Sequence, residues 1–378
     1  MNPVTLMEEG DRHGWAAGFA AQFCRKGETM RKRAAVAMSG GVDSSAAAVL
    51  LLEAGYEVYG ITLRLRPEPT GSAGDDIATA RAVADKLGIR HEVLDLRSRF
   101  SEAVMDRFVA EYVKGHTPNP CVDCNRTIKF GALLDYVLEN GTDFLATGHY
   151  ARIDREEPSG RLLLLRGRDR RKDQSYFLNQ LSQRQLSHLL FPVGDFEKQE
   201  IRAVAMAHGL KSADRPESQD ICFVPSGDYV AFLREYGGID PAPGDFVDET
   251  GRVLGRHQGL VCYTAGQRKG LGVSAEEPLY VVSKDLTAGT IRLGPNSALY
   301  SGELTAGALN WISVSELKGP LPVTAKTRYS QQEAAATVEP LENNLVHVLF
   351  DEPQRAVTPG QAVVFYDGER VVGGGTIC

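Results

Sequence analysis

The residues of this chain that are best placed to do chemistry lie in one short glycine-rich segment, Ser39-Gly40-Gly41-Val42-Asp43-Ser44-Ser45. An apolar run from Ala34 to Met38 precedes it, and a helical pattern from Ser44 to Ala54 follows. Two glycines let the backbone approach an anion closely, and the first N–H groups of the helix, which lack intrahelical partners, point at that anion. The serines add hydroxyl donors. The segment is therefore predicted to bind phosphate groups.

Asp43 adds a condition to this prediction. A carboxylate repels phosphates unless a divalent cation bridges them, which implies Mg²⁺. The segment is not a Walker A motif, because no Gly-Lys-Ser/Thr follows, and it is not a dinucleotide fingerprint, because the third glycine is absent. A tight turn with a Ser/Asp helix cap would explain the same residues, but the strand before it and the helix after it favour the phosphate site.

Cysteines form the second candidate group. The six lie at positions 24, 121, 124, 222, 262 and 378, too few and too scattered for a disulfide scaffold. A structural zinc site needs four ligands, and only one Cys-x-x-Cys pair, Cys121 and Cys124, is present. Prolines and polar residues around that pair argue against cysteines packed in a core. Reactive thiols are the remaining interpretation, with Arg126 and Lys129 close enough in sequence to lower a thiol pKa.

The elements around these residues alternate between strand and helix. After the glycine segment, strands are expected at 57–63, 91–96 and 143–147, with helices striped by apolar residues between them. This alternation predicts an α/β fold with a parallel sheet covered on both faces. Ligands of such sheets bind at the carboxyl ends of the strands. The glycine segment and Gly148-His149 both fall there.

The pattern changes near Gly227, where short segments split by glycine and proline replace the helices. From about Gly302 to the end, short apolar runs separated by turn residues predict a small β-barrel. We therefore expect an extension over 1–29, a catalytic domain over 30–228, a central linker domain over 229–302, and a β-barrel over 303–378.

Composition limits the class of protein. Hydrophobic residues make up 43% and charged residues 24% of the 378 residues, as in ordinary globular proteins. No apolar run approaches the ~20 residues that span a bilayer, and residues 1–29 do not read as a secretory signal. We expect a cytoplasmic protein with reduced thiols and no membrane partner. A net charge of −7 means that any nucleic acid must be bound by local basic patches.

Several segments carry a resemblance to known families. The glycine segment is similar to the Ser-Gly-Gly-x-Asp-Ser signature of the PP-loop ATP pyrophosphatases, which cut ATP between the α- and β-phosphates. An ordered set of segments from about residue 33 to 377 resembles the tRNA-specific 2-thiouridylases. Besides the glycine segment, the set comprises Thr117–Pro120 with Cys124-Asn125, Ala146–Tyr150, Lys172–Phe177, Ser218–Phe223, Tyr263–Gly272, Lys326–Tyr329 and Thr358–Gln361.

The resemblance implies a fold and an activity. The fold would be a Rossmann-like parallel sheet, the PP-loop domain of the adenine nucleotide alpha hydrolase type, with a small central domain and a C-terminal β-barrel. ATP would adenylate the C2 oxygen of the wobble uridine in tRNA for Lys, Glu and Gln. Sulfur would then replace that oxygen and give 2-thiouridine. It would come from a cysteine persulfide that a cysteine desulfurase loads through sulfur-relay proteins.

The same resemblance assigns roles to residues. Cys222 would carry the persulfide, and Cys124 would be the nucleophile that resolves the transfer through a transient disulfide with Cys222. ATP would be bound by Ala37, Met38, Ser39, Gly40, Gly41, Val42, Asp43, Ser44, Leu63 and Gly148. Asn119, Pro120 and Cys121 would contact the target base. Contacts with tRNA would come from His149, beside the nucleotide site, and from Lys172, Asp173, Gln174, Arg328, Tyr329 and Gln361. The central linker domain over 229–302 would also contact the tRNA.

Cys121 departs from part of the family, because some members carry Asp there as a proposed acid or base. With Cys124 and Cys222 it makes three cysteines, which would suit a [4Fe–4S] cluster with one open iron site, an alternative route to the same product. A PP-loop amide ligase acting on a small metabolite is a second alternative, although it leaves the cysteines and the β-rich third of the chain unexplained. An RNA-binding adaptor with a decayed nucleotide fold is disfavoured by the intact glycine segment.

A run of cations forms the main candidate patch for tRNA. It comprises Arg161, Arg166, Arg168, Arg170, Arg171 and Lys172, and Arg268-Lys269 is a smaller patch. Phosphate contacts by Lys and Arg supply most nucleic-acid affinity. A solvated charged face is the competing interpretation. An anticodon loop offers bases that are already partly unpaired, which lowers the cost of taking one out of the stack.

Overall fold

The computed structural model describes residues 32–66, 73–210, 221–224 and 226–378, so the expected extension over 1–29 and the segment 218–220 lie outside the described residues. The chain divides into two compact units. Unit 1 comprises residues 1–101, 124–219 and 369–371, and unit 2 comprises 102–123, 220–368 and 372–378. No helix in the described ranges is long and apolar enough to cross a membrane.

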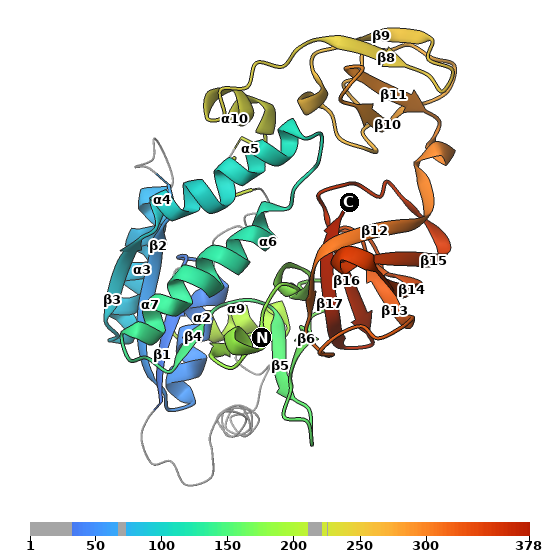
Figure 1. Ribbon diagram of the computed structural model, residues 1–378. Helices are drawn as coiled ribbons and strands as arrows, with labels where there is room; N and C mark the ends of the chain where they lie inside the picture. The colour runs from blue at the N-terminus through green and yellow to red at the C-terminus, as the bar shows by residue number, and fades with distance from the viewer. Residues whose placement is uncertain (1–31, 67–72, 211–220, 225) are drawn as a thin grey trace, which may run out of the picture. The chain divides into compact units, whose positions relative to one another are not determined.

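Unit 1 is built on a five-stranded sheet with the order β3-β2-β1-β4-β7 (Figure 1). All neighbouring strands are parallel. The central strand is buried on both sides, since Ala34, Ala35 and Val36 have no exposed surface, as expected for a covered parallel strand. The strands are β1 (Arg33–Ala37), β2 (Glu57–Arg64), β3 (His91–Asp95), β4 (Phe144–Ala146) and β7 (Leu189–Leu190).

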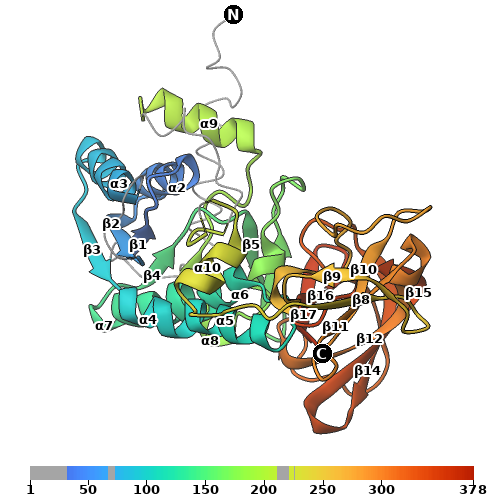
Figure 2. The same ribbon diagram turned by 90° about the horizontal axis from the view of Figure 1, so that it is seen from above.

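Helices lie on both faces of this sheet (Figure 2). The helices α2, α3 and α9 lie on one face, and α4 and α7 lie on the other. Helix α2 is almost entirely buried, because its Ala and Leu side chains pack on β1, β2 and α9. The predicted parallel sheet with helices on both faces is therefore confirmed. The helices of unit 1 are α2 (Val42–Glu53), α3 (Ala73–Leu87), α4 (Arg97–Phe100), α7 (Leu134–Glu139), α8 (Gln183–Leu186) and α9 (Lys198–Ala207), with a π-helical segment at Asn125–Leu133.

The strand order contains a topological switch point. From β1 the chain moves through α2 to β2 on one side, whereas β4 pairs with β1 on its other side. Loops that leave the carboxyl ends of two such strands diverge and leave a crevice for a ligand. The glycine loop after β1 and the Thr147–His149 loop after β4 are the two loops at this point.

A hairpin that the sequence analysis did not predict completes unit 1. It consists of β5 (Ala151–Arg155) and β6 (Leu162–Arg166), paired in antiparallel register. Leu165 pairs with Arg370, which lies in the short segment 369–371 that belongs to this unit. Four consecutive leucines in β6 show no alternation of apolar and polar residues that would signal a strand.

Unit 2 contains a central domain with its own β-sheet, in the order β10-β11-β8-β9. Its core includes Phe246, Tyr263, Val281 and Ile291. The sequence analysis describes this region only as short segments split by glycine, because strands of four to six residues give a weak periodic pattern. The strands are β8 (Gly244–Val247), β9 (Val253–His257), β10 (Tyr280–Asp285) and β11 (Thr290–Gly294), and the helices of unit 2 are α5 (Asp106–Val113) and α10 (Tyr229–Glu235).

The end of the chain forms the predicted β-barrel, which is confirmed. Six strands follow the order β12-β15-β14-β13-β16-β17, and pairing of β12 with β17 closes the barrel. Alternate residues such as Val346, Val348 and Phe350 fill the interior. The strands are β12 (Tyr300–Trp311), β13 (Leu321–Lys326), β14 (Ala334–Leu341), β15 (Leu345–Arg355), β16 (Ala362–Asp367) and β17 (Arg370–Ile377).

Candidate active site

The glycine loop connects β1 to α2 in a shape held by its own serines. Gly40 has a φ of +73°, which a residue with a side chain rarely adopts. The Ser44 and Ser45 hydroxyls donate hydrogen bonds to the Gly41 carbonyl at 3.2 and 2.8 Å, and the Ser39 amide donates to the Ser44 hydroxyl at 3.2 Å. Gly41 caps α2 without a side-chain hydrogen bond to the helix. The N-terminus of a 12-residue helix therefore opens onto a loop that suits an anion.

Gly148 lies directly against this loop. A Cβ atom at position 148 would lie 2.7 Å from the Asp43 carbonyl carbon and 2.7 Å from the Ser44 nitrogen, so only glycine fits. Next to it, the Thr147 hydroxyl and His149 Nδ1 are 2.7 Å apart. The structure thus brings together the two loops that the sequence analysis places at the carboxyl ends of strands. Two other residues expected to bind ATP, Met38 and Leu63, lie just after β1 and in β2.

Asp43 is the centre of a charged cluster that joins three elements of unit 1. Lys198 Nζ lies 2.7 Å from Oδ1 and 2.8 Å from Oδ2 of Asp43. The Tyr150 hydroxyl donates to Oδ1 at 2.8 Å. Both carboxylate oxygens are therefore engaged by side chains from α9 and from the segment after β4.

His149 is buried among the rings of Phe130 and Phe191. Burial lowers its pKa well below the ordinary value, and the nearby Lys129 ammonium adds to this effect. The imidazole is therefore neutral at pH 7. A neutral, buried ring cannot form an ion pair with a tRNA phosphate, so in this conformation His149 packs beside the nucleotide loop.

Two of the three neighbouring residues expected to contact tRNA make hydrogen bonds within unit 1. Asp173 Oδ1 accepts hydrogen bonds from the Gly167 and Ser175 amides at 3.0 and 3.1 Å. Gln174 Oε1 accepts from the Tyr150 amide at 3.0 Å, which fixes the residue that contacts Asp43. Lys172 is half-buried, at the start of the same turn.

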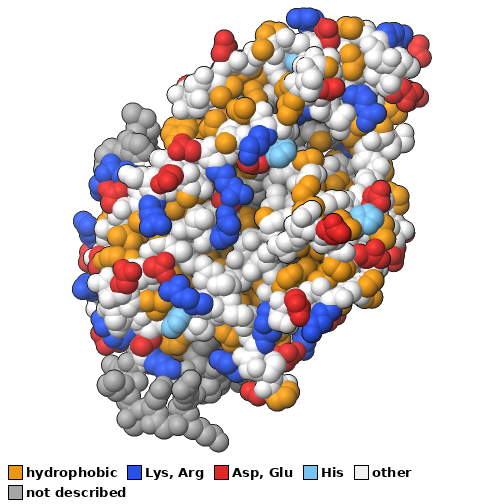
Figure 3. Space-filling view, in the orientation of Figure 1, with side chains coloured by type: hydrophobic (Ala, Val, Ile, Leu, Met, Phe, Trp, Pro, Cys, Tyr) orange, Lys and Arg blue, Asp and Glu red, His pale blue; other side chains and the backbone are white. Residues whose placement is uncertain are grey.

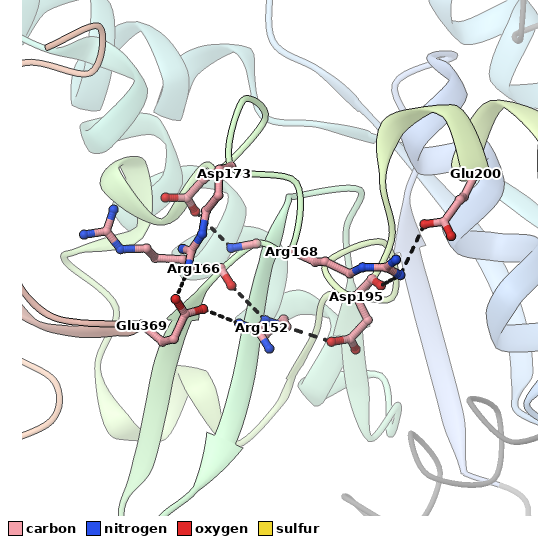
Figure 4. A network of polar contacts seen from close by, with 9 residues as sticks. Arg152, Arg166, Arg168, Asp173, Asp195, Glu200 and Glu369 are labelled. Atoms are coloured by element: carbon pink, nitrogen blue, oxygen red, sulfur yellow. Dashed lines mark hydrogen bonds and ion pairs between the residues drawn. The ribbon is translucent and has the colours of Figure 1, made fainter. Parts of the chain in front are cut away.

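Two residues of the predicted basic run, Arg168 and Arg170, are paired with acidic side chains, and Arg152 of β5 lies in the same network (Figure 4). Glu369 forms ion pairs with Arg152 and Arg170, and Arg168 contacts Glu200 at 3.4 Å. Arg152 also lies 3.9 Å from Asp195. On the face drawn in Figure 3, Lys and Arg side chains are interspersed with Asp and Glu. Part of the positive charge of this run is thus neutralised within the protein.

The cysteines differ in exposure. Cys121 and Cys222 are exposed, and Cys124 is buried with 8% of its surface accessible. Cys121 and Cys124 both lie in α6 (Pro120–Cys124), which runs into the π-helical segment at Asn125. The expectation that the flanking prolines and polar residues keep this pair out of a core is therefore wrong for Cys124. A single helical turn is enough to direct one thiol outward and the other inward.

Within unit 2, hydrogen bonds from the barrel hold the loop before α6. Gln361 Nε2 donates to the Thr117 carbonyl at 2.7 Å, and the Thr117 amide donates to the Pro359 carbonyl at 2.9 Å. We call residues Thr358–Gln361 the barrel turn. It fixes the two residues that precede Asn119, Pro120 and Cys121, the expected contacts of the target base.

Arg328 connects the barrel turn to the central domain of the same unit. Its Nη2 donates to the Thr358 hydroxyl at 2.6 Å and to the Ala265 carbonyl at 3.2 Å. Tyr329 is 37% exposed, and Lys326 Nζ lies 5.3 Å from its ring centroid. Of the barrel residues expected to contact tRNA, Arg328 and Gln361 therefore make internal hydrogen bonds, whereas Tyr329 presents an aromatic face.

Cys222 is anchored through its neighbour. The ring of Phe223 packs against Phe108 at 5.3 Å and Phe232 at 5.0 Å between centroids, so α5 and α10 hold the described part of the segment. The cysteine itself is exposed. The backbone beside an exposed cysteine is therefore held in place.

Comparison with known proteins gives a consistent family. The model of the tRNA methyl transferase HUP domain matches residues 32–226, that of the tRNA methyl transferase PRC-barrel domain matches 230–295, and that of the aminomethyltransferase beta-barrel domain matches 301–377. The tRNA-specific 2-thiouridylase MnmA of Acetivibrio thermocellus is 48% identical over 92% of this chain and 99% of its own length. That of Heliobacterium modesticaldum is 50% identical over 92% of this chain and 93% of its own.

This chain belongs to the tRNA-specific 2-thiouridylase family. The predicted enzyme class, a sulfurtransferase, is thereby confirmed. Among solved structures, the U34-tRNA thiolase NcsA from Methanococcus maripaludis covers 60% of this chain and 72% of its own at 19% identity, with a TM-score of 0.37, a likeness too weak to bear on the site.

A resident divalent cation does not fit the side chains of this 2-thiouridylase at Asp43. Lys198 contacts both carboxylate oxygens of Asp43. Within the described ranges, no three His, Cys, Asp or Glu side chains gather as metal ligands. Any Mg²⁺ would therefore arrive with the phosphates of ATP as part of the substrate.

Lys198 and Tyr150 are the site residues that sequence reasoning missed. Lys198 is 155 residues away from Asp43 and begins an ordinary amphipathic helix. Tyr150 closes the Ala146–Tyr150 segment, which signalled a loop at a strand end but gave no role for the ring. Only the tertiary structure brings both to the carboxylate.

Proposed function

We propose that this enzyme makes 2-thiouridine at the wobble position of tRNA for Lys, Glu and Gln, using ATP to activate the base and a cysteine persulfide to supply sulfur. The observation that carries the proposal is the glycine loop at the switch point of the sheet, with Gly148 packed against the start of α2. Relatives of about the same length, at 48–50% identity, bear the name tRNA-specific 2-thiouridylase.

The first step activates C2 of uracil, which is a poor electrophile with a poor leaving group. The C2 oxygen attacks the α-phosphorus, the bond from that phosphorus to the β-phosphate oxygen breaks, and pyrophosphate leaves. N3 of the ring loses its proton as the adenylate forms. In this proposal the glycine loop, with Ala37 to Ser44, Leu63 and Gly148, binds ATP. The loop amides would orient the phosphates for in-line attack.

The second step exchanges oxygen for sulfur. The terminal sulfur of a Cys222 persulfide attacks C2, and AMP leaves with the original oxygen. The Cys124 thiolate then attacks the Cys222 sulfur, which forms a Cys124–Cys222 disulfide and leaves sulfur on C2. N3 regains a proton, and an external dithiol reduces the disulfide. An exposed Cys222 suits loading by a sulfur-relay protein, and a buried Cys124 is protected from side oxidation until the transfer.

The tRNA contacts are proposed in two groups. Lys172 and Tyr329 would touch the tRNA directly, by a phosphate contact and by base or sugar stacking. Asp173, Gln174, Arg328 and Gln361 would act by holding the neighbouring turns, because their side chains are engaged in internal hydrogen bonds. Asn119, Pro120 and Cys121 would receive the flipped base, and His149 would line the nucleotide site.

The decisive test is mass spectrometry of tRNA nucleosides after incubation with ATP, Mg²⁺ and a persulfide donor. The wild type should form 2-thiouridine and release pyrophosphate only when tRNA is present. C124S and C222S should form no detectable 2-thiouridine but still release pyrophosphate. C378S, which changes another exposed thiol, is the matched control and should retain full activity.

Three outcomes would contradict parts of this proposal. Pyrophosphate release without tRNA would indicate an amide ligase of the PP-loop class. Thiolation retained in both C124S and C222S would overturn the roles of these cysteines. A requirement for anaerobically reconstituted iron and sulfide, with no activity from persulfide alone, would favour the [4Fe–4S] alternative.

A further inference from the structure

We propose that Lys198 is a catalytic residue of the ATP half-reaction and supplies the fixed positive charge that the glycine loop lacks. The inference rests on the proposed function. In a Walker A motif a lysine within the loop itself faces the phosphates. Here the loop contains no Lys or Arg, and the chain delivers an ammonium from the start of α9 instead.

Contacts hold the ammonium in place. The Lys198 side chain is 9% exposed, and its Nζ lies 2.7 and 2.8 Å from the two oxygens of Asp43. The Lys198 amide donates to Asp169 Oδ2 at 3.1 Å, which fixes the first turn of α9. Helix α9 packs along α2, the helix that begins in the glycine loop. The cation therefore has a defined position relative to the loop and needs little reorganisation to act there.

Charge balance explains why the cation is needed. Asp43 is the second residue of α2, at the end of the helix where the triphosphate would bind. Like charges only a few ångströms apart at a protein surface repel each other, so an unpaired carboxylate there would oppose the nucleotide. Lys198 cancels this charge in the free enzyme. Conversely, Asp43 supplies the opposite charge that compensates the burial of the lysine side chain.

The chemistry points to the leaving group. When the bond between the α-phosphorus and the β-phosphate oxygen breaks, its electron pair passes to pyrophosphate, whose negative charge increases. A preorganised ammonium stabilises that charge more in the transition state than in bound ATP, so its effect appears in the rate of the step. Lys198 transfers no proton. Its side chain would exchange part of its contact with Asp43 for contact with the phosphates.

The competing explanation is that Lys198 only neutralises Asp43 and pins α9 to α2. The double variant D43N/K198M separates the two ideas, because it removes both charges and keeps the site neutral. If neutralisation is the whole role, the double variant should recover most of the activity lost in K198M. If Lys198 acts on the phosphates, the double variant stays slow.

The experiment measures single-turnover pyrophosphate release with tRNA and saturating ATP, together with the Kd for ATP. We expect K198M and D43N/K198M both to slow release by roughly 100- to 1000-fold. Their Kd for ATP should change less than tenfold, and K198R should regain at least tenfold of the rate. K318M, which changes a side chain that is 80% exposed, is the control and should match the wild type.

Recovery of the double variant to within tenfold of the wild type would overturn the inference, as would a loss seen only in the Kd. The double variant leaves no unpaired buried charge. Its rate of pyrophosphate release therefore tests the role of Lys198 even if K198M alone folds poorly. Release by the wild type that ignores tRNA would contradict the proposed function. The comparison among the Lys198 variants would still decide what Lys198 does to pyrophosphate release.

Discussion

Lys284 carries its ammonium into the interior of the central domain. Its Nζ is buried and makes no hydrogen bond within the described part of the chain. Burial lowers the pKa of Lys284 from its ordinary value near 10.5 to about 8, and the Cys262 thiol opposes this shift only weakly. Folding therefore disfavours the charged amine at pH 7, and the folded state loses its proton at a lower pH than the unfolded state does.

The sign of this shift gives a stability prediction. Below about pH 8 both states bind the proton, and the folded state bears the full desolvation cost. Between about pH 8 and 10.5 only the unfolded state is protonated, so the free energy of unfolding rises with pH. We expect K284M to stabilise the protein by roughly 1 to 3 kcal/mol at pH 7 and to lose that advantage toward pH 10. Urea unfolding of K284M and of the exposed control K318M at pH 7 and 9.5 checks this, and an equal gain at both pH values would contradict it.

Single residues also show where sequence reasoning stops. Gly148 could be placed at the carboxyl end of a strand, because strand periodicity and the glycine after it are local signals. Lys198 could not be predicted as the partner of Asp43, since no local pattern relates residues 43 and 198. Burial of Cys124 was missed for a similar reason: prolines and polar neighbours describe the backbone around a thiol, whereas the packing of distant helices decides its exposure.

At the scale of elements, a substitution in the barrel turn Thr358–Gln361 can show whether the barrel positions the loop before α6. Gly360 has a φ of +89°, and a Cβ there would lie 2.8 Å from the Cβ of His116 and 3.1 Å from the Thr117 amide nitrogen. We expect G360A to release the loop, because both the backbone strain and the contact push the two segments apart. Hydrogen exchange should show at least tenfold faster exchange of the Thr117 amide, with loss of thiolation.

Gly368 supplies the matched control for this element. Its φ is +54°, so alanine is strained there too, but a Cβ would meet nothing within 4 Å. G368A should therefore leave the exchange of Thr117 unchanged. Equal effects of the two variants would mean that backbone strain in the barrel, rather than the contact with the loop, is responsible.

Elements differ in how far the sequence predicts them. The Rossmann-like sheet and the barrel were predictable, because each rests on repeated apolar runs with clear turn residues between them. The β5–β6 hairpin and the central sheet were not, since their strands are short and interrupted by arginine or glycine. The hairpin also pairs with a strand far along the chain, because Leu165 of β6 is the partner of Arg370 of β17, about two hundred residues away.

At the scale of the whole molecule, a net charge of −7 must be reconciled with a polyanionic substrate. Arg152, Arg168 and Arg170 are held by Glu369, Glu200 and Asp195, so the positive charge that the sequence run suggests is only partly available. Arg152 lies in β5, and Arg168 and Arg170 lie in the turn after β6. We infer that they organise the hairpin, and that tRNA phosphates are met by the cations that remain.

Arg171 allows a direct test of which cations bind the tRNA and which are neutralised by internal ion pairs. It is exposed and makes no ion pair with the residues that the structure describes, whereas its neighbour Arg170 is paired with Glu369. Each phosphate contact contributes about 0.7 to 0.9 to the slope of log affinity against log salt concentration. R171A should therefore weaken tRNA binding at low salt and reduce that slope by about one contact. R170A should change the slope less, because the Arg170 cation is already neutralised by Glu369.

Fluorescence titrations with tRNA at several KCl concentrations, between roughly 50 and 300 mM, measure the slope for both variants. Identical slopes for R170A and R171A would contradict the argument that internal ion pairs decide which cations bind the tRNA.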